Sequence, residues 1–393
     1  MEELVSLLQT AGGECRGIVL QNRKDPDPRS FFGEGKVEEI KALAETEECT
    51  LLVVDNELSP SQTKALEDDL GIHVIDRSGL IIDIFAQRAA TKEGQLQVSL
   101  TQYKYLLPRL TGMWTHLVRQ TASGGSRIGT RGPGETQLET DRRHIRRKIA
   151  KLEEELEQVR RVRSTQRRAR EKNGIQTVAL VGYTNAGKST LLNALTGAGI
   201  HTGDRLFDTL DTTTRRLRVS PVKEVLVSDT VGFIRKLPHH LIEAFKATLE
   251  ELSYADLLLH VIDASSPSWE EQAEVVENLL NELGANATPR INVFNKCDRT
   301  PPSTVHVMGG AVFVSALTGD GLADLTEKIA SILDDSRLVK FFIPYDKASL
   351  IDMLYRDGGD VKIDYSQEGI AVQAICTREL YGRLRDYVTE VVE

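Results

Sequence analysis

Apolar side chains recur along this chain with two different periods, and the periods divide it into regions. Between residues 1 and 80, short apolar runs that suit strands alternate with segments whose apolar residues recur every three or four positions. The run at 51–54 predicts a buried strand, and Ser59 followed by Pro60 predicts a helix that continues to Leu70. Two more strands are expected at 15–20 and 72–75, and one more helix at 36–47. Together these elements predict a small α/β unit.

A heptad pattern follows between residues 81 and 172. Its first part has apolar residues at spacings of four, three, four and three, namely Leu96, Leu100, Tyr103, Leu107 and Leu110. A second part repeats this spacing at Ile145, Ile149, Leu152, Leu156 and Val159. Two such seams predict an antiparallel helical hairpin. With more than about 25 residues per helix it would be about 40 Å long, and we expect it to project from the body of the protein.

Strand-like apolar runs return after Asn173–Gly174, which breaks the helical pattern. They lie at residues 177–181, 225–232, 257–263, 290–295 and 312–317. The last part of the chain predicts strand, helix, strand, strand and helix, at 339–344, 347–355, 361–365, 370–374 and 378–388.

The 393 residues are too many for one core. We therefore expect an α/β fold class with four domains: an α/β unit at 1–80, a helical hairpin at 81–172, a nucleotide-binding domain at 173–337 and a small α+β domain at 338–393. A loop at about 111–134 would form the tip of the hairpin.

The clearest chemical motif lies between the run at 177–181 and a helix start. Its form is G-x-x-x-x-G-K-[ST], the phosphate-binding loop of P-loop NTPases. The residues are Gly182, Tyr183, Thr184, Asn185, Ala186, Gly187, Lys188 and Ser189. Glycine lets backbone N–H groups approach phosphates, and the following helix N-terminus adds its dipole. Lys188 should reach the β- and γ-phosphates, and Ser189 should offer its hydroxyl to Mg²⁺.

A polar, threonine-rich loop follows at 207–215. A threonine there can close over Mg²⁺ and sense the γ-phosphate. Thr209 is the expected residue, although Thr212, Thr213 or Thr214 could replace it. The expected contacts in this loop are Phe207, Asp208, Thr209, Leu210 and Asp211.

The run at 225–232 ends in D-x-x-G, formed by Asp229, Thr230, Val231 and Gly232. Asp229 would hold a water ligand of Mg²⁺, and the Gly232 N–H would meet the γ-phosphate. Hydrolysis would then depend on Lys188, Thr209, Asp229 and Gly232.

Two later motifs point to guanine. Asp298, in N-K-x-D, can accept hydrogen bonds from N1–H and N2–H₂ of guanine, a donor pair that adenine lacks. Lys296 would lie along the base plane, and the backbone at Ser315–Ala316 can contact the guanine O6. The full expected set is Asn295, Lys296, Cys297, Asp298, Ser315, Ala316 and Leu317. The order of these motifs at the ends of apolar strands predicts a GTP site and argues against a P-loop kinase.

Charge is distributed unevenly. The whole chain carries a net charge of −9, but residues 141–172 hold thirteen basic and six acidic side chains. The expected tip loop is rich in glycine and contains Arg127 and Arg131, with Arg109 and Arg119 before it. Glycines allow close approach to a phosphate backbone and arginines pair with phosphates, so this region predicts RNA contact.

Four dispersed cysteines without a C-x-x-C pair fit free thiols in a reducing cytosol and give no support for zinc. The first ten residues do not resemble a signal peptide, and no apolar run is long enough for a membrane span. We therefore expect a cytoplasmic protein.

The motifs resemble those of the HflX family of GTPases over nearly the whole chain. The most specific runs are Val74-Ile-Asp-Arg-Ser-Gly-Leu80, Tyr105-Leu-Leu-Pro-Arg-Leu110 and the segment from Ile128 to Arg143. The resemblance implies a cytosolic GTPase that binds the large ribosomal subunit and splits stalled ribosomes, notably after heat stress. We expect the protein to be a monomer. It also implies Ser189 and Thr209 as Mg²⁺ ligands and the tip loop as the part that reaches ribosomal RNA. Arg127 departs from the glycine of the family pattern.

Two residues refine the expected mechanism. Phe233 stands where Ras-like GTPases carry the glutamine that orients water, so intrinsic hydrolysis should be slow and ribosomes should stimulate it. Asn185 matches an asparagine of potassium-dependent GTPases and could help hold K⁺, or it could only shape the loop. The alternative function is a GTP-gated RNA-binding assembly factor that does not split ribosomes. ATP use by the N-terminal unit has no support in the sequence.

Overall fold

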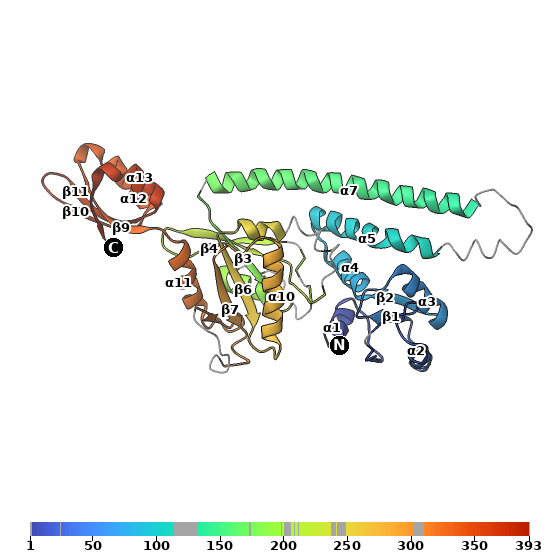
Figure 1. Ribbon diagram of the computed structural model, residues 1–393. Coiled ribbons are helices and arrows are strands. Elements are labelled where there is room, and N and C mark those ends of the chain that lie inside the picture. The colour runs from blue at the N-terminus through green and yellow to red at the C-terminus, as the bar shows by residue number, and fades with distance from the viewer. Residues whose placement is uncertain are drawn as a thin grey trace, which may run out of the picture. The chain divides into compact units, whose positions relative to one another are not determined.

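The structure is a computed structural model (Figure 1). It describes residues 2–23, 25–113, 133–172, 174–197, 199, 206–207, 209–210, 212–236, 241, 249–301 and 310–392. Most of the expected tip loop, with Arg119, Arg127 and Arg131, therefore lies outside the described residues, as do Asp208 and Asp211. The chain forms two compact units. The first comprises Met1–Gln166, Gly203–Asp211 and Val231–Glu250, and the second Arg167–Thr202, Thr212–Thr230 and Glu251–Glu393.

The first unit begins with an α/β part that matches most of the sequence expectation. Its elements are α1 (Glu2–Thr10), α2 (Glu34–Thr46), β1 (Leu51–Val54), α3 (Pro60–Leu70), β2 (His73–Asp76) and α4 (Arg77–Arg88). β1 and β2 pair in parallel, and Leu66 and Leu70 of α3 pack in the core with Val54. The predicted start of α3 is confirmed, because Ser59 and Gln62 form a capping box with Pro60 at the first turn.

One predicted strand of this part is wrong. Residues 15–20 are extended but form no β-ladder, and their apolar side chains Ile18 and Leu20 are 51% and 66% exposed. The apolar run suits a strand, but a strand also needs a neighbouring strand for its N–H and C=O groups. Among the described residues, β1 pairs only with β2 and leaves residues 15–20 without such a neighbour.

The heptad seams form two antiparallel helices, α5 (Lys92–Met113) and α7 (Pro133–Lys172), which run beside each other in Figure 1. The seam holds buried Leu96, Leu100 and Leu156 together with Ile149, Leu152 and Val159. Two ion pairs fix the register: Lys104 with Glu153 at 2.9 Å, and Arg163 with Glu93 at 2.7 Å.

The prediction that the helical hairpin projects from the body of the protein is wrong for α5. The described part of this helix has 22 residues, and it packs on α3 and α4. The side chains of Tyr105 and Arg109 cause this packing, because they reach back to Asp76 at the start of α4. The Tyr105 hydroxyl donates to Asp76 at 2.8 Å, and Arg109 pairs with the same carboxylate at 2.7 Å.

The second unit contains a six-stranded sheet with the order β4-β5-β3-β6-β7-β8. The strands are β3 (Thr177–Gly182), β4 (Thr213–Arg218), β5 (Glu224–Asp229), β6 (Leu257–Asp263), β7 (Arg290–Asn295) and β8 (Val312–Phe313). All pairs are parallel except β4–β5. Helices α8 (Lys188–Thr196), α10 (Trp269–Glu282) and α11 (Leu322–Leu333) accompany the sheet, and η1 (Glu250–Tyr254) precedes β6. The parallel strands bring the ends that carry the predicted motifs to one edge.

The end of the chain forms a four-stranded antiparallel sheet with the order β10-β11-β9-β12. Its elements are β9 (Arg337–Ile343), η3 (Tyr345–Lys347), α12 (Ser349–Asp357), β10 (Gly359–Tyr365), β11 (Ile370–Cys376), α13 (Arg378–Arg383), η4 (Arg385–Tyr387) and β12 (Val388–Val392). The predicted helix at 378–388 is too long, and β12 was missed. Val388, Val391 and Val392 suit a strand because they are β-branched, and β9 supplies the partner edge.

Within the described part of the chain, no helix is both long enough and apolar enough to cross a lipid bilayer.

Candidate functional site

The phosphate-binding loop joins β3 to α8, and its two glycines are required by its shape. Gly182 has φ 156°, and a Cβ added there would lie 2.2 Å from the carbonyl oxygen of Val261. Gly187 has φ 90°, and its Cβ would lie 2.3 Å from Nδ2 of Asn295. Any larger residue would push the loop away from β6 and β7.

Lys188 crosses the inside of this loop. Its Nζ donates to the carbonyl oxygens of Gly182 at 3.1 Å and Tyr183 at 2.9 Å. Burial lowers the pKa of Lys188 to about 8, although the charge of Asp229 acts in the opposite direction. A bound polyphosphate would supply the missing negative charge, so the site favours an anion.

Ser189 and Asp229 meet at the ends of α8 and β5. The Ser189 hydroxyl donates to Oδ2 of the buried Asp229 at 2.5 Å. The next residue, Thr230, donates to the carbonyl of Leu180 at 2.6 Å and so ties this strand end to β3. A hydroxyl beside a carboxylate is a set of hard oxygen donors, which suits Mg²⁺ directly or through water.

Asn295 connects the phosphate loop to the loop after β8. Its Nδ2 donates to the carbonyl of Ala186 at 2.9 Å, and its Oδ1 accepts from the N–H of Ala316 at 3.0 Å. Asn295 is 2% exposed, so both bonds form in a buried environment. The first residue of N-K-x-D therefore orders two loops rather than facing solvent.

The other residues of N-K-x-D are also held in place. Ser315 donates to Oδ1 of Asp298 at 2.7 Å, which orients that carboxylate. Lys296 has φ 65° and pairs with Asp263, the last residue of β6, at 2.8 Å. The N–H of Cys297 donates to the carbonyl of Val314. Asp263 was not predicted as a site residue, although it ends a predicted strand.

The threonine-rich segment divides between structural elements. Thr213 and Thr214 lie in β4 opposite Asp229 and Ser228, and the hydroxyls of Thr214 and Ser228 are 3.0 Å apart. These two threonines therefore belong to a strand and not to a loop. Thr209 belongs to the first unit, where it is half-buried.

Aromatic packing holds the residues beside Thr209. The Phe207 ring lies edge-on to Phe85 of α4, with ring centroids 4.7 Å apart. Phe207 and Leu210 are both buried. Phe85 was not predicted to contact this segment, because a helix core residue gives no signal of it in the sequence.

The residues after Thr230 are also anchored in the first unit. Gly232 and Phe233 are buried, and Phe233 is only 2% exposed. The Arg77 guanidinium donates to the carbonyl of Arg235 at 3.0 Å, and Lys236 pairs with Asp55 at 2.8 Å. Neither Asp55 nor Arg77 was predicted here, although a buried arginine in an apolar run is a signal that a charged partner is needed.

Helix α7 carries the predicted basic surface, but not all of its cations are available. Arg163 pairs with Glu93, and Arg167 stacks 3.6 Å over the ring of Tyr254. Four exposed arginines of α7 have no acidic partner among the residues that the structure describes, and three of them, Arg143, Arg146 and Arg147, lie close together in the sequence; the fourth is Arg168. Arg109, which was expected to contribute to an RNA-contacting surface, instead pairs with Asp76.

The phosphate loop, the Ser189–Asp229 pair and the N-K-x-D loop on this parallel sheet define a P-loop GTPase. Three family models match the chain: "GTP-binding GTPase N-terminal" at 1–86, "GTP-binding GTPase Middle Region" at 88–170 and "50S ribosome-binding GTPase" at 177–296. Two relatives named GTPase HflX support the same assignment. That of Caldanaerobacter subterraneus subsp. tengcongensis is 49% identical over 99% of this chain and 90% of its own length, and that of Escherichia coli is 46% identical over 85% and 79%. The chain belongs to the HflX family of GTPases.

Among solved structures, the chain is similar to SsGBP in complex with GDP. The TM-score is 0.48 at 26% identity, over 84% of this chain and 94% of that one.

Proposed function

We propose that this GTPase binds the large ribosomal subunit and uses GTP to split or rescue stalled ribosomes. The observation that carries the proposal is that a phosphate-binding loop, an N-K-x-D loop held beside it and a long helix with an exposed basic surface occur in one chain. The description of the matching family model, a 50S ribosome-binding GTPase, supports the choice of partner.

Nucleotide recognition would use the residues that the structure orders. Asp298, oriented by Ser315, accepts hydrogen bonds from guanine, and Lys188 neutralises the β- and γ-phosphates. Ser189 and Thr209 would hold Mg²⁺, with Asp229 accepting a hydrogen bond from one of its waters. When bound, Mg²⁺ supplies positive charge to the phosphates.

Contact with RNA would use the arginines of α7. Arg146 and Arg147 follow Arg143 by three and four residues, so both lie on the same side of the helix as Arg143. Exposed guanidinium groups on one face can pair with successive phosphates of an RNA backbone. The tip loop lies outside the described residues, and in this proposal it reaches ribosomal RNA beyond the helix end.

Slow intrinsic hydrolysis follows from Phe233. This residue follows D-x-x-G, and its side chain is buried and apolar, so it cannot orient an attacking water. The ribosome would supply or position the missing group. The protein would act in the cytoplasm, where its partner is, and as a monomer.

Potassium would act at Asn185. The amide oxygen of this exposed residue would help hold K⁺ against the phosphates, in the place of an arginine finger. Asn185 also has φ 61°, a conformation that asparagine adopts more readily than most residues, which supports a role in loop shape alone. Equal hydrolysis rates in KCl and NaCl would leave only that second role.

The test measures GTP hydrolysis with and without purified large subunits. We expect stimulation for the unchanged protein and a loss of stimulation, with unchanged basal rate, when Arg143, Arg146 and Arg147 are all replaced by Gln. The matched control replaces three exposed basic residues elsewhere by Gln, namely Lys41, Lys328 and Arg378.

Sedimentation of intact ribosomes separates splitting from assembly. When intact ribosomes are incubated with the protein and a non-hydrolysable GTP analogue, a splitting factor shifts material from the peak of intact ribosomes to the peaks of the subunits. An unchanged peak together with binding to free large subunits would favour the assembly-factor alternative.

A further inference from the structure

Asp263, the last residue of β6, lies beside the first residue of the N-K-x-D motif. In the parallel pairing of β6 with β7, Asp263 is opposite Asn295. The pairing continues one step further, because the N–H of Ala264 donates to the carbonyl of Asn295 at 2.9 Å. The sheet therefore fixes the backbone at Asp263 against the backbone that carries the motif.

The two oxygens of the Asp263 carboxylate have different partners. Oδ1 accepts hydrogen bonds from the N–H of Ser265 at 2.9 Å and from its hydroxyl at 2.6 Å. Oδ2 lies 2.8 Å from Nζ of Lys296. Since Ser265 holds the first oxygen with two donors, the carboxylate is fixed in orientation and its second oxygen is directed at the lysine.

Lys296 has a backbone conformation that is uncommon for a residue with a Cβ. Its φ of 65° lies in the left-handed region, and its carbonyl accepts a hydrogen bond from the N–H of Arg299 at 2.9 Å as the chain turns. A residue in such a conformation persists when its surroundings hold it there. The ion pair with Asp263 is one of the contacts that hold it.

The ion pair matters because a mobile lysine would have to be ordered by the ligand. Lysine has a long flexible stem, which loses much conformational entropy when a ligand immobilises it. Ordering one such side chain on binding lowers affinity by a factor of about two to ten. Both side chains of the pair are only 17% exposed, so water competes weakly for the ammonium group and the lysine is already ordered in the free protein.

We propose that Asp263 is a positioning residue for guanine nucleotides, which holds the Lys296 side chain in place before the base arrives. The inference rests on the nucleotide site described above, in which Lys296 lies along the base plane. In that arrangement Asp263 contacts neither the base nor the phosphates and acts through Lys296 alone. A stem that lies against a ring does not distinguish the groups at the ring's edge. Asp263 should therefore strengthen binding without selecting the base, a selection that falls to Asp298 in this site.

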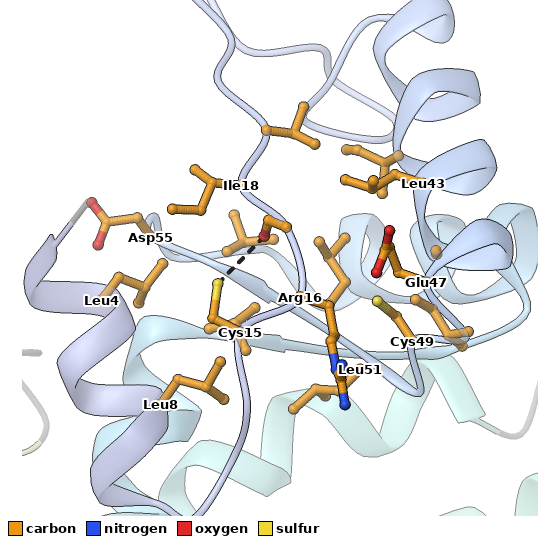
Figure 2. Close-up of a pocket in the computed structure, with 18 of the residues that line it drawn as sticks. Leu4, Leu8, Cys15, Arg16, Ile18, Leu43, Glu47, Cys49, Leu51 and Asp55 are labelled. Atoms are coloured by element: carbon orange, nitrogen blue, oxygen red, sulfur yellow. Dashed lines mark hydrogen bonds between the residues drawn. The ribbon is translucent and has the colours of Figure 1, made fainter.

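A second ion pair of the same kind provides a comparison. Asp55 directly follows β1, and its Oδ2 lies 2.8 Å from Nζ of Lys236. Asp55 is among the residues that line a cavity of about 900 Å³ in the α/β part, and Figure 2 shows its side chain there. Among the described residues, none that would contact guanine lines this cavity. Asp55 and Lys236 therefore repeat the strand-end ion pair outside the motifs for base recognition.

The experiment uses the full chain and measures dissociation constants for GDP and inosine diphosphate, by competition with a fluorescent guanine nucleotide. Inosine diphosphate lacks the N2 amino group of guanine, so the ratio of the two constants reports the position of Asp298. Asp263→Asn keeps an acceptor for Ser265 but removes the charge that holds Lys296. We expect both constants to rise by about five-fold and their ratio to stay within about two-fold of that of the unchanged protein.

Lys296→Met removes the same ion pair from its other side. Methionine keeps an unbranched stem but lacks the ammonium group, so both constants should rise by a similar factor. In the double variant, Asp263→Asn should add less than about two-fold to the effect of Lys296→Met. A merely structural role of Asp263 would not depend on Lys296 in this way. Thermal unfolding checks that each variant is folded, and Lys296→Met tests the same pair if Asp263→Asn is not.

The matched control is Asp55→Asn. It makes the same chemical change at the other strand-end pair and should lower stability, but both dissociation constants should stay within about two-fold of those of the unchanged protein. Diphosphates are the suitable probes, because they lack the γ-phosphate that Gly232 would meet.

Three results would overturn the proposal. One is binding of both diphosphates by Asp263→Asn as tightly as by the unchanged protein. Another is weaker binding of GDP alone, because Asp263 would then act on Asp298. The third is an equal loss from Asp263→Asn with and without Lys296. Binding of ADP as tightly as GDP by the unchanged protein would instead contradict the guanine site itself.

Discussion

Nζ of Lys236 lies 2.8 Å from Oδ2 of Asp55, so a residue just beyond the D-x-x-G motif is tied to the end of β1. Asp55 also accepts a hydrogen bond from Arg77 at 2.7 Å. Burial raises the pKa of Asp55, but the hydrogen bonds from Lys236 and Arg77 outweigh it and the pKa is lowered overall. The α/β part of the chain therefore holds the backbone that follows Gly232 through a charged contact.

Replacing Asp55 by Asn should loosen this contact. The carboxylate that serves two cations is lost, and the buried Arg77 is left with less compensation, so we expect a loss of about 1–3 kcal/mol in the free energy of unfolding. Urea titration measures that loss, and hydrogen exchange should become faster at residues 231–236. The control is Asp69→Asn. Asp69 pairs with the exposed Arg29, so this substitution should lower the free energy of unfolding by less than about 1 kcal/mol. Equal effects of the two variants would contradict this account.

Asp298→Asn should change base specificity. Asparagine presents an N–H₂ group or a single amide oxygen where guanine needs two acceptor positions, so GTP affinity should fall by about 100-fold or more. Xanthosine triphosphate has a carbonyl at C2 and should bind the variant better than GTP. Competition titration with a fluorescent nucleotide measures both affinities.

Ser315→Ala provides the matched comparison for Asp298. It removes the 2.7 Å hydrogen bond that orients Asp298, together with the one that the Ser315 hydroxyl accepts from the N–H of Thr318 at 3.2 Å. GTP affinity should fall by about ten-fold while the preference for guanine stays. If Asp298→Asn bound GTP as tightly as the unchanged protein, Asp298 would not contact the base.

Nucleotide affinity should weaken as the pH rises past 8. Burial lowers the pKa of Lys188 to about 8 in the free protein, and bound phosphates would raise it again because they favour the charged amine. Binding is therefore strongest below pH 8, where Lys188 is already charged in the free protein. Above pH 8, nucleotide binding must also protonate Lys188, and this weakens the affinity. Between pH 7.0 and 8.5 the dissociation constant for GDP should rise about fourfold. The Lys188→Met variant should bind GDP weakly at both pH values and lose this pH dependence. If the variant kept a pH dependence of the same size, a group other than Lys188 would be its cause.

Substitutions of Arg109 and Arg146 should have different effects, the first on stability and the second on RNA binding. Arg109 pairs with the 1% exposed Asp76 and stacks 3.5 Å over the Tyr105 ring, so Arg109→Ala should cost about 3–5 kcal/mol in the free energy of unfolding. Arg146→Ala removes an exposed side chain and should change stability by less than about 0.5 kcal/mol, while it weakens binding to large subunits. Thermal unfolding and subunit co-sedimentation measure the two effects. Equal destabilisation by both variants would show that Arg146 is also structural.

The sequence allowed the nucleotide-binding fold to be predicted because most of the motifs follow an apolar run. Strands β3 and β6 are buried on both faces, so their sequences contain little else. The start of α3 was predictable for a different reason, since Ser59 and Pro60 act within one turn of the helix.

The errors occurred where distant partners decide the structure. Residues 15–20 have the composition of a strand but no neighbouring strand among the described residues. The local sequence of β12 suits the end of a helix, because its pairing with β9 is not visible locally. Arg109 was assigned to an RNA-contacting surface from its charge alone. Its partner, Asp76, lies 33 residues away in the sequence, and only the fold brings the two together.

The contacts of Asn295 have a thermodynamic consequence. One buried amide fixes both Ala186 of the phosphate loop and Ala316 of the loop that would face guanine O6. A phosphate group that orders the first loop would lower the entropy cost of ordering the second, and the base would do the same for phosphate by an equal factor. Guanosine and inorganic diphosphate, added as separate fragments, should then bind cooperatively, with each raising the affinity of the other to the same extent.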